Sequence, residues 1–219
     1  LLNRAPSLHK YNILSFKPVP HTIEEGMVLK LNPLVFKGFG ADADGDEMAI
    51  HALLDEKSIS EADRLSPTHP TNMLSIASGE PILDFDQDFV LGNFLHNGKN
   101  KKSELTRIGK MIAPKSDFKD RILSEMRSAF EKVTTCGVSF SYLELLDCML
   151  DKGDLKKAMK VEVRNVNSTL EGLTKKRLEK ALSDSSNPGY YFAAMALSGA
   201  RGSKQTRQVI GARGMLSPG

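Results

Sequence analysis

The spacing of hydrophobic positions changes at about residue 85. Before that point, short apolar stretches such as residues 29–36 and 48–54 are separated by prolines and acidic residues. This pattern predicts short extended segments over residues 1–54 and favours a small, irregular, barrel-like β structure. Residues 55–65 predict a short surface helix, and the Pro- and Gly-rich residues 66–82 predict a loop.

After that point the apolar residues recur every three or four positions, which predicts helices. Ser141 and Glu144 have the spacing of a capping box at the start of one of them. The Lys-rich residues 97–115 show no clear period and predict a linker, whereas residues 138–140 predict a short strand. The fold class is therefore α+β. The expected helices cover residues 86–96, 117–133, 141–151 and 154–183, a stretch that begins at Pro188, and residues 203–212.

Charge is distributed unevenly along the chain. The 219 residues have a net charge of +3. Residues 1–98 hold 7 Lys and Arg against 14 Asp and Glu, whereas residues 99–219 hold 23 against 13. An acidic half followed by a basic half fits a polyanionic ligand that contacts both. The alternative explanation for the positive charge of residues 99–180 is that Lys-rich helices are simply solvated. The charge of the chain end is more one-sided. After Asp184 it has no acid and four cations, Arg201, Lys204, Arg207 and Arg213.

The composition argues against several classes of protein. No apolar run approaches the roughly 18 residues of a membrane span, so no membrane contact is expected. The first residues show no signal-peptide pattern, and the cytoplasm is the expected compartment. The two cysteines, Cys136 and Cys148, are too few for a disulfide framework or a four-ligand zinc site.

The segment Ala41-Asp42-Ala43-Asp44-Gly45-Asp46 is the main candidate for chemistry. Its three carboxylates occupy alternate positions, which share a face in an extended segment. Gly45 permits a bend that brings them closer together. Like charges held this close repel each other unless a cation lies among them. Magnesium suits such a site, because it binds carboxylate oxygens and keeps positions free for water and phosphate.

Two other interpretations of this acidic segment remain. A solvated turn is the simplest, because Asp and Gly are common turn residues. A calcium loop of the EF-hand kind needs Gly at position 6 and Glu at position 12 counted from Asp42, where this chain has Glu47 and Leu53. Apolar runs on both sides favour a loop that is held between buried strands.

Four blocks of the sequence, in the same order, resemble the largest (β′-type) subunit of multisubunit DNA-dependent RNA polymerases. Residues 3–9 (NRAPSLH) resemble the family's N-R-x-P-[ST]-L-H segment. Residues 42–51 (DADGDEMAIH) resemble its N-A-D-F-D-G-D-x-M-A-x-H signature. Residues 72–88 contain N-M-L-S, G-E-P-I and Q-D in the family's order. Residues 198–214 resemble the S-G-A-R-G-S…R-Q…R-G segment around the F-loop.

This resemblance implies a fold, a reaction and a metal. The reaction would be template-directed nucleotidyl transfer from a nucleoside triphosphate to the RNA 3′ end. Asp42, Asp44 and Asp46 would hold the catalytic Mg2+, and a second Mg2+ would arrive with the triphosphate. The implied regions are a double-psi β-barrel over residues 1–82 with the metal loop at 40–46, a helical pore- or funnel-like region over 83–185, and an F-loop-like region over 186–219 that precedes the bridge helix.

The resemblance also implies substrate-binding roles for four arginines. Arg4 would lie near the ribose of the incoming nucleotide or near the RNA end. Arg201 would meet the triphosphate, which a planar guanidinium suits. Arg207 and Arg213 would belong to the F-loop region that supports the active site. The alternatives are a structural ion pair for Arg4 and a helix-terminus cation for Arg201.

The chain departs from the family pattern in the metal loop and in its length. Gly40 stands where the family usually has Asn, a residue implied in sensing the ribose 2′-hydroxyl. Ala43 replaces the usual Phe, which removes packing volume. The stretch between residues 98 and 185 is much shorter than in typical bacterial subunits. This divergence resembles the reduced polymerases of large bacteriophages, whose large subunits are often split.

The resemblance implies partners as well. The bridge helix and trigger loop would come from the remaining β′-type segment. Further partners would be the β-type second-largest subunit, the DNA template, the RNA transcript and nucleoside triphosphates. The chain alone is expected to be inactive, and a phage-encoded chain would work in the host cytoplasm or the virion. Two alternatives are an RNA-dependent RNA polymerase of the double-psi barrel type, whose family lacks the first and last blocks, and a non-catalytic, polymerase-derived scaffold that binds nucleic acid.

Overall fold

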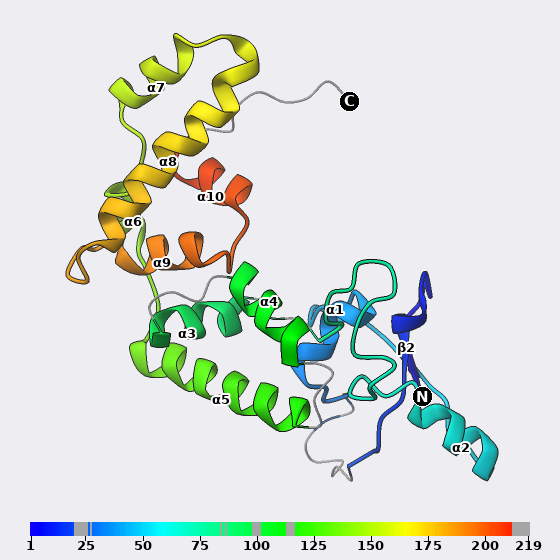
Figure 1. Cartoon of the computed structure of the whole chain (residues 1–219). Helices are drawn as coiled ribbons and strands as arrows, with labels where there is room; N and C mark the ends of the chain where they lie inside the picture. Colours follow the sequence, from blue (N-terminus) through cyan, green and yellow to red (C-terminus); the bar gives the residue numbers. More distant parts are fainter. Residues whose placement is uncertain are drawn as a thin grey trace. The chain divides into compact units, whose positions relative to one another are not determined.

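A computed structural model describes residues 1–19, 26, 28–83, 85, 87–97, 102–112 and 117–211 (Figure 1). The chain divides into two compact units. The first contains Leu1–Phe85 and Thr106–Ile122, and the second contains Asp86–Leu105 and Leu123–Gly219. Helices α4 (Lys102–Ile112) and α5 (Phe118–Cys136) each contribute residues to both units.

The first unit contains a small antiparallel sheet. Its strands are β1 (Leu2–Asn3), β2 (Ile13–Leu14) and β3 (Ala49–Ile50), in the order β2-β1-β3. The expected β structure of residues 1–54 is therefore limited, in the described residues, to three two-residue strands. The fold class is α+β, and the double-psi barrel stays a prediction. The other elements of this span are the 3-10 helices η1 (Lys10–Asn12) and η3 (Pro33–Val35) and the short helix α1 (Phe36–Phe39).

The core of the first unit gathers apolar residues that lie far apart in the sequence. Phe39, at the end of α1, is fully buried, and its ring lies 6.1 Å from that of Phe16. This packing fixes the end of α1, where the acidic loop begins. The other buried apolar residues of the unit include Leu2, Leu14, Leu34, Val35, Met73, Ile82, Leu83, Phe85, Phe118 and Ile122.

Helix α2 (Glu56–Asp63) confirms the expected surface helix. It begins after Asp55, whose carboxylate accepts a hydrogen bond from the Ser58 N–H at 2.9 Å, as is usual at a helix start. The predicted linker at 97–115 is wrong, because Lys102–Ile112 form α4. Leu105, Ile108 and Ile112 recur at helical spacing, but the many lysines around them obscured this period.

The second unit is helical in its described residues. The capping box of Ser141 and Glu144 is confirmed at the start of α6. The predicted strand at 138–140 is wrong, since these residues form no strand and the Phe140 ring instead packs at 5.2 Å against that of Phe192. Besides α5, the helices are α3 (Gln87–Asn97), α6 (Tyr142–Leu146), α7 (Lys152–Met159), η4 (Val163–Asn165), α8 (Val166–Leu182), α9 (Tyr190–Ser198) and α10 (Ser203–Val209).

Helix α8 organises the core of the second unit and packs against α9 and α10 (Figure 1). One cluster of buried residues lies around Cys148 and Phe192, and a smaller one lies between α7 and α8. In the part of the chain that the structure describes, no helix is both long and apolar enough to cross a membrane. The clusters comprise Leu145, Cys148, Leu178, Ala181, Phe192, Ala193 and Ile210, and Leu150, Ala158 and Leu170.

Candidate metal centre

The acidic segment lies on the loop that joins α1 to β3. Gly40 ends α1 in a left-handed conformation (φ +61°), and its N–H donates to the Lys37 carbonyl at 3.0 Å. Glycine adopts this conformation without steric cost, and Asn is the next most tolerant residue at a helix end. Gly40 in place of the family's usual Asn is therefore compatible with the local backbone. The added Cβ would lie 3.8 Å from Arg4 Nη1, an ordinary contact.

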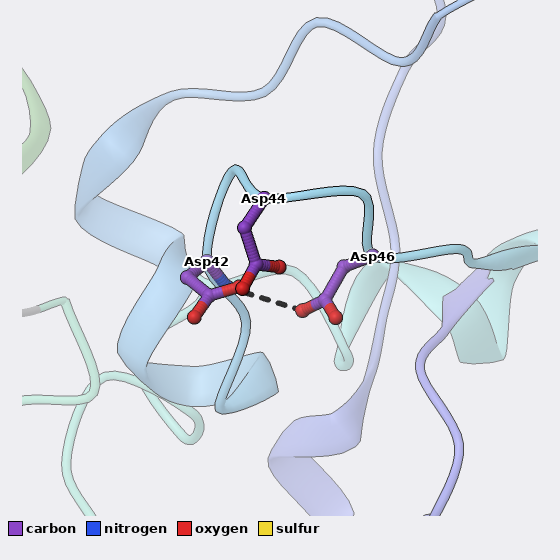
Figure 2. Close-up of side chains that lie close together, drawn as sticks. All are labelled: Asp42, Asp44 and Asp46. Carbon is purple, nitrogen blue, oxygen red and sulfur yellow. Dashed lines mark hydrogen bonds between the residues drawn. The ribbon is translucent and has the colours of Figure 1, made fainter.

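The three carboxylates converge. Asp42, Asp44 and Asp46 are exposed, and each offers one oxygen that lies within 4.8 Å of the other two (Figure 2). Gly45 has φ +119°, a conformation that favours glycine and turns the chain between the second and third acids. The expected convergence is thus present, but it comes from a bent loop and not from one face of a strand.

Arg4 binds the third carboxylate of this cluster. Its Nε donates to Asp46 Oδ2 at 2.8 Å and its Nη2 to Asp46 Oδ1 at 3.3 Å, a paired geometry that suits a guanidinium. Strand β1 pairs with β3, with Asn3 opposite Ala49, and this register brings Arg4 beside the acidic loop. The Asp42 N–H also donates to Asp46 Oδ2, at 3.1 Å (Figure 2). Asp46 is therefore held from two sides.

The electrostatics of the cluster differ from one acid to the next. The pKa of Asp42 is raised, first because its side chain shares a hydrogen bond with Asp44 and then through partial burial and the charges of Asp44 and Asp46. The pKa of Asp46 is lowered, chiefly by the hydrogen bond from Arg4 and then by the Asp42 N–H. The carboxyl of Asp42 therefore holds its proton to a higher pH than an ordinary aspartate does.

The residues fit a divalent cation with oxygen ligands. Three carboxylates and one guanidinium have a formal charge of about −2, which one such ion balances. Octahedral ligands at about 2.1 Å lie roughly 3 to 4.2 Å apart, so a small closure from the present spacing completes three positions. The exposure of all three acids leaves the remaining positions open to water or phosphate oxygens.

Two of the other predicted arginines, Arg201 and Arg207, lie in the second unit. Arg201 is exposed and follows Gly199, which ends α9 in a left-handed conformation (φ +85°). Arg207 is only 4% exposed, and its Nη1 donates to the Asn167 carbonyl and to Glu171 Oε1, both at 3.3 Å. These contacts give Arg207 a packing role within the unit. Arg213 lies outside the described residues, and contact of any of these arginines with substrate stays a prediction.

Asn12 is a positioning residue that sequence reasoning missed. It is 4% exposed, and its side-chain amide donates to the Phe39 carbonyl at 2.9 Å. Its Oδ1 accepts from the His9 N–H at 3.1 Å. The side chain thus ties the N-terminal segment to the end of α1, directly before the acidic loop. The only signal in the sequence is an amide within the otherwise apolar run from Tyr11 to Leu14.

Comparison with known proteins relates the chain to RNA polymerase subunits. A family model described as RNA polymerase Rpb1, domain 2, matches residues 1–68, which include Arg4 and all three acids. The DNA-directed RNA polymerase subunit beta′ of Emiliania huxleyi is 40% identical over 147 residues, which are 67% of this chain and 23% of that protein. The beta′ subunit of Rhodomonas salina is 47% identical over 107 residues (48% and 16%), and that of Fusobacterium nucleatum 48% over 94 residues (43% and 7%).

The matched stretches are short compared with the relatives themselves. The chain spans less than a quarter of the length of these beta′ subunits. The names of these relatives nevertheless agree with the family model that matches residues 1–68. The chain is therefore related to part of the largest, β′-type subunit of multisubunit DNA-directed RNA polymerases.

Proposed function

We propose that this chain supplies the metal-binding part of the active site of a DNA-directed RNA polymerase. The observation that carries the proposal is the convergence of Asp42, Asp44 and Asp46 on a loop that belongs to the family-matched region. The reaction is nucleotidyl transfer from a nucleoside triphosphate to the RNA 3′ end on a DNA template. The chain acts in a multisubunit complex with a β-type subunit and the rest of the β′-type sequence, and it is inactive alone.

The three carboxylates bind Mg2+ in this proposal. When bound, the ion lowers the pKa of the RNA 3′-hydroxyl and stabilises charge at the α-phosphate, and a second ion comes with the triphosphate. A cation among the acids would lower the raised pKa of Asp42, because it would offset the charges of Asp44 and Asp46. The Asp42 N–H would continue to orient Asp46. The double-psi barrel is the fold we infer for the assembled site, and the cytoplasm its compartment.

Cleavage by Fe2+ tests whether the acidic loop binds a metal ion. Fe2+ in the place of Mg2+ generates hydroxyl radicals locally, so with ascorbate and peroxide we expect backbone cuts close to residue 44. Excess Mg2+ should suppress them, and Asp44→Asn should abolish them. Asp63→Asn, which removes an exposed carboxylate from α2, is the matched control and should be cut like the wild type. Uniform cutting along the chain, or the same cuts in Asp44→Asn, would contradict a metal ion at this loop.

Arg4 competes with a metal ion for Asp46, so Arg4→Gln should have two opposite effects. Exposed ion pairs contribute little, so loss of this one should tighten Mn2+ binding by up to about fivefold. Nucleotide incorporation by the assembled complex should fall, since the proposed contact with ribose or RNA is lost. Calorimetric titration with Mn2+ measures the first effect, with Arg64→Gln as the control arginine on the surface. Weaker Mn2+ binding in Arg4→Gln would show that Arg4 supports the site and does not compete for it.

A further inference from the structure

Residues of helices α7 and α8 in the second unit line an open hollow of about 400 Å3. The two helices are neighbours in the same unit (Figure 1). The lining is strongly basic, with four cations, one carboxylate and one apolar side chain. The lining residues are Asp154, Lys157, Leu173, Lys176, Arg177 and Lys180.

One cation of the hollow is already neutralised. Arg177 Nε donates to Asp154 Oδ2 at 2.9 Å, and its Nη2 binds the carboxylates of Asp151 and Asp154. Asp154 is buried, and Asp151 accepts the Asp154 N–H at the start of α7. This network fixes the two helices against each other. It also makes Arg177 a structural residue, unsuited to releasing its partners for a ligand.

The lysines of the hollow have fewer acidic partners than Arg177 has. Lys157 Nζ lies 3.7 Å from Asp154 Oδ1, but that carboxylate is shared with Arg177. Among the described residues, no carboxylate lies within ion-pair distance of Lys176 or Lys180. These two lysines are four residues apart on α8, so their like charges repel on one helix face. The hollow therefore carries an excess of positive charge that an anion would relieve.

We propose that this hollow, which we call the α7–α8 basic hollow, binds the phosphate backbone of a single-stranded nucleic acid. Lys176 and Lys180 lie one turn apart, about 6 Å along the helix axis, a spacing that their flexible side chains can match to neighbouring phosphates. Lys157 contributes a third ammonium from α7. Leu173 gives the hollow an apolar wall. The contact depends on the charge of the phosphate backbone and not on the base sequence.

A strand fits these features better than a small polyphosphate does. The hollow is open to solvent and is not an enclosed pocket with buried donors. The inference does not depend on the acidic loop, which belongs to the other unit.

Fluorescence anisotropy with a labelled 12-nucleotide RNA tests the proposal. The full chain is titrated in EDTA, so that the metal site plays no part, over a range of salt concentrations. Lys176→Gln/Lys180→Gln should weaken binding at least about tenfold at low salt and should reduce the slope of log K against log salt by about 1.4. The matched control is Lys156→Gln/Lys160→Gln, which removes two exposed lysines at the same spacing outside the hollow. It should change affinity by less than about threefold.

Each outcome bears on the proposal. Loss of affinity in the Lys176/Lys180 variant alone supports it, given an unchanged circular dichroism spectrum. An equal loss of affinity in both double variants would show that the binding is general electrostatic attraction, and it would overturn the assignment to the hollow. No loss in either variant would also overturn it. Inorganic tripolyphosphate that binds the wild-type chain as tightly as the RNA would assign the hollow to a compact polyphosphate instead.

Discussion

Asp44→Asn is expected to abolish RNA synthesis by the assembled polymerase while leaving its assembly intact. Asparagine keeps the shape of the side chain but removes one of three charges from the cluster, so the ion is lost or displaced. A catalytic metal stabilises the transition state by several kcal/mol, and loss of about 4 kcal/mol lowers the rate about a thousandfold. Incorporation of a labelled nucleotide into a primed RNA measures the effect, with co-purification of the partner chains as the check on assembly.

The same assay separates the proposed function from its alternatives. Asp63→Asn, the control carboxylate on α2, should leave the rate within about twofold of the wild type, since it lies outside the cluster. A wild-type complex that assembles on nucleic acid but makes no RNA would indicate a non-catalytic scaffold. Synthesis directed by an RNA template alone would favour the RNA-dependent enzyme. Undiminished synthesis in Asp44→Asn would exclude the acidic loop from catalysis.

Gly92→Ala is expected to be the most destabilising small substitution in the second unit. A Cβ at Gly92 on α3 would lie 2.1 Å from the Ala129 carbonyl oxygen on α5 and 2.5 Å from its carbon. The obstacle is backbone, so no side-chain rotation relieves it and the two helices must separate. Forced overpacking of this kind costs about 3 kcal/mol. Thermal unfolding followed by circular dichroism should show a fall in Tm of roughly 6–12 °C.

Gly172→Ala provides the control for this prediction. Gly172 also lies inside a helix, α8, but no neighbouring atom lies within 4 Å of the position of its Cβ. Alanine there should stabilise the chain by about 0.5–1 kcal/mol, because alanine favours the helix more than glycine does. If both variants unfolded at the wild-type temperature, that result would contradict the close packing of α3 against α5 at Gly92.

Local sequence signals predicted the helices best. The Ser141–Glu144 capping box is a short-range pattern, and α6 begins directly after Ser141. Helix α4 was missed because polar and charged residues separate its few apolar positions. The prediction of a strand at 138–140 was wrong for a different reason. Phe140 is buried in part by one aromatic ring, Phe192, from a distant helix, and no strand pairs with it.

The clustering of the three acids was predictable from the sequence, but the contacts that support the cluster were not. The spacing of Asp42, Asp44 and Asp46 was enough to expect their convergence. The ion pair between Arg4 and Asp46 depends on the pairing of β1 with β3, and strands of two residues leave almost no pattern in a sequence. The burial of Arg207 beside Glu171 depends on how α10 packs on α8, which no local motif encodes.

The segment formed by residues 2–4 is bonded to the acidic loop at two places. It pairs with β3, which follows the loop, and Arg4 reaches back to Asp46 within it. A shift of this segment would therefore move a carboxylate even if the loop kept its own conformation. It follows that a ligand seated on the N-terminal residues and an ion among the acids would be thermodynamically linked, each altering the affinity of the other by the same factor.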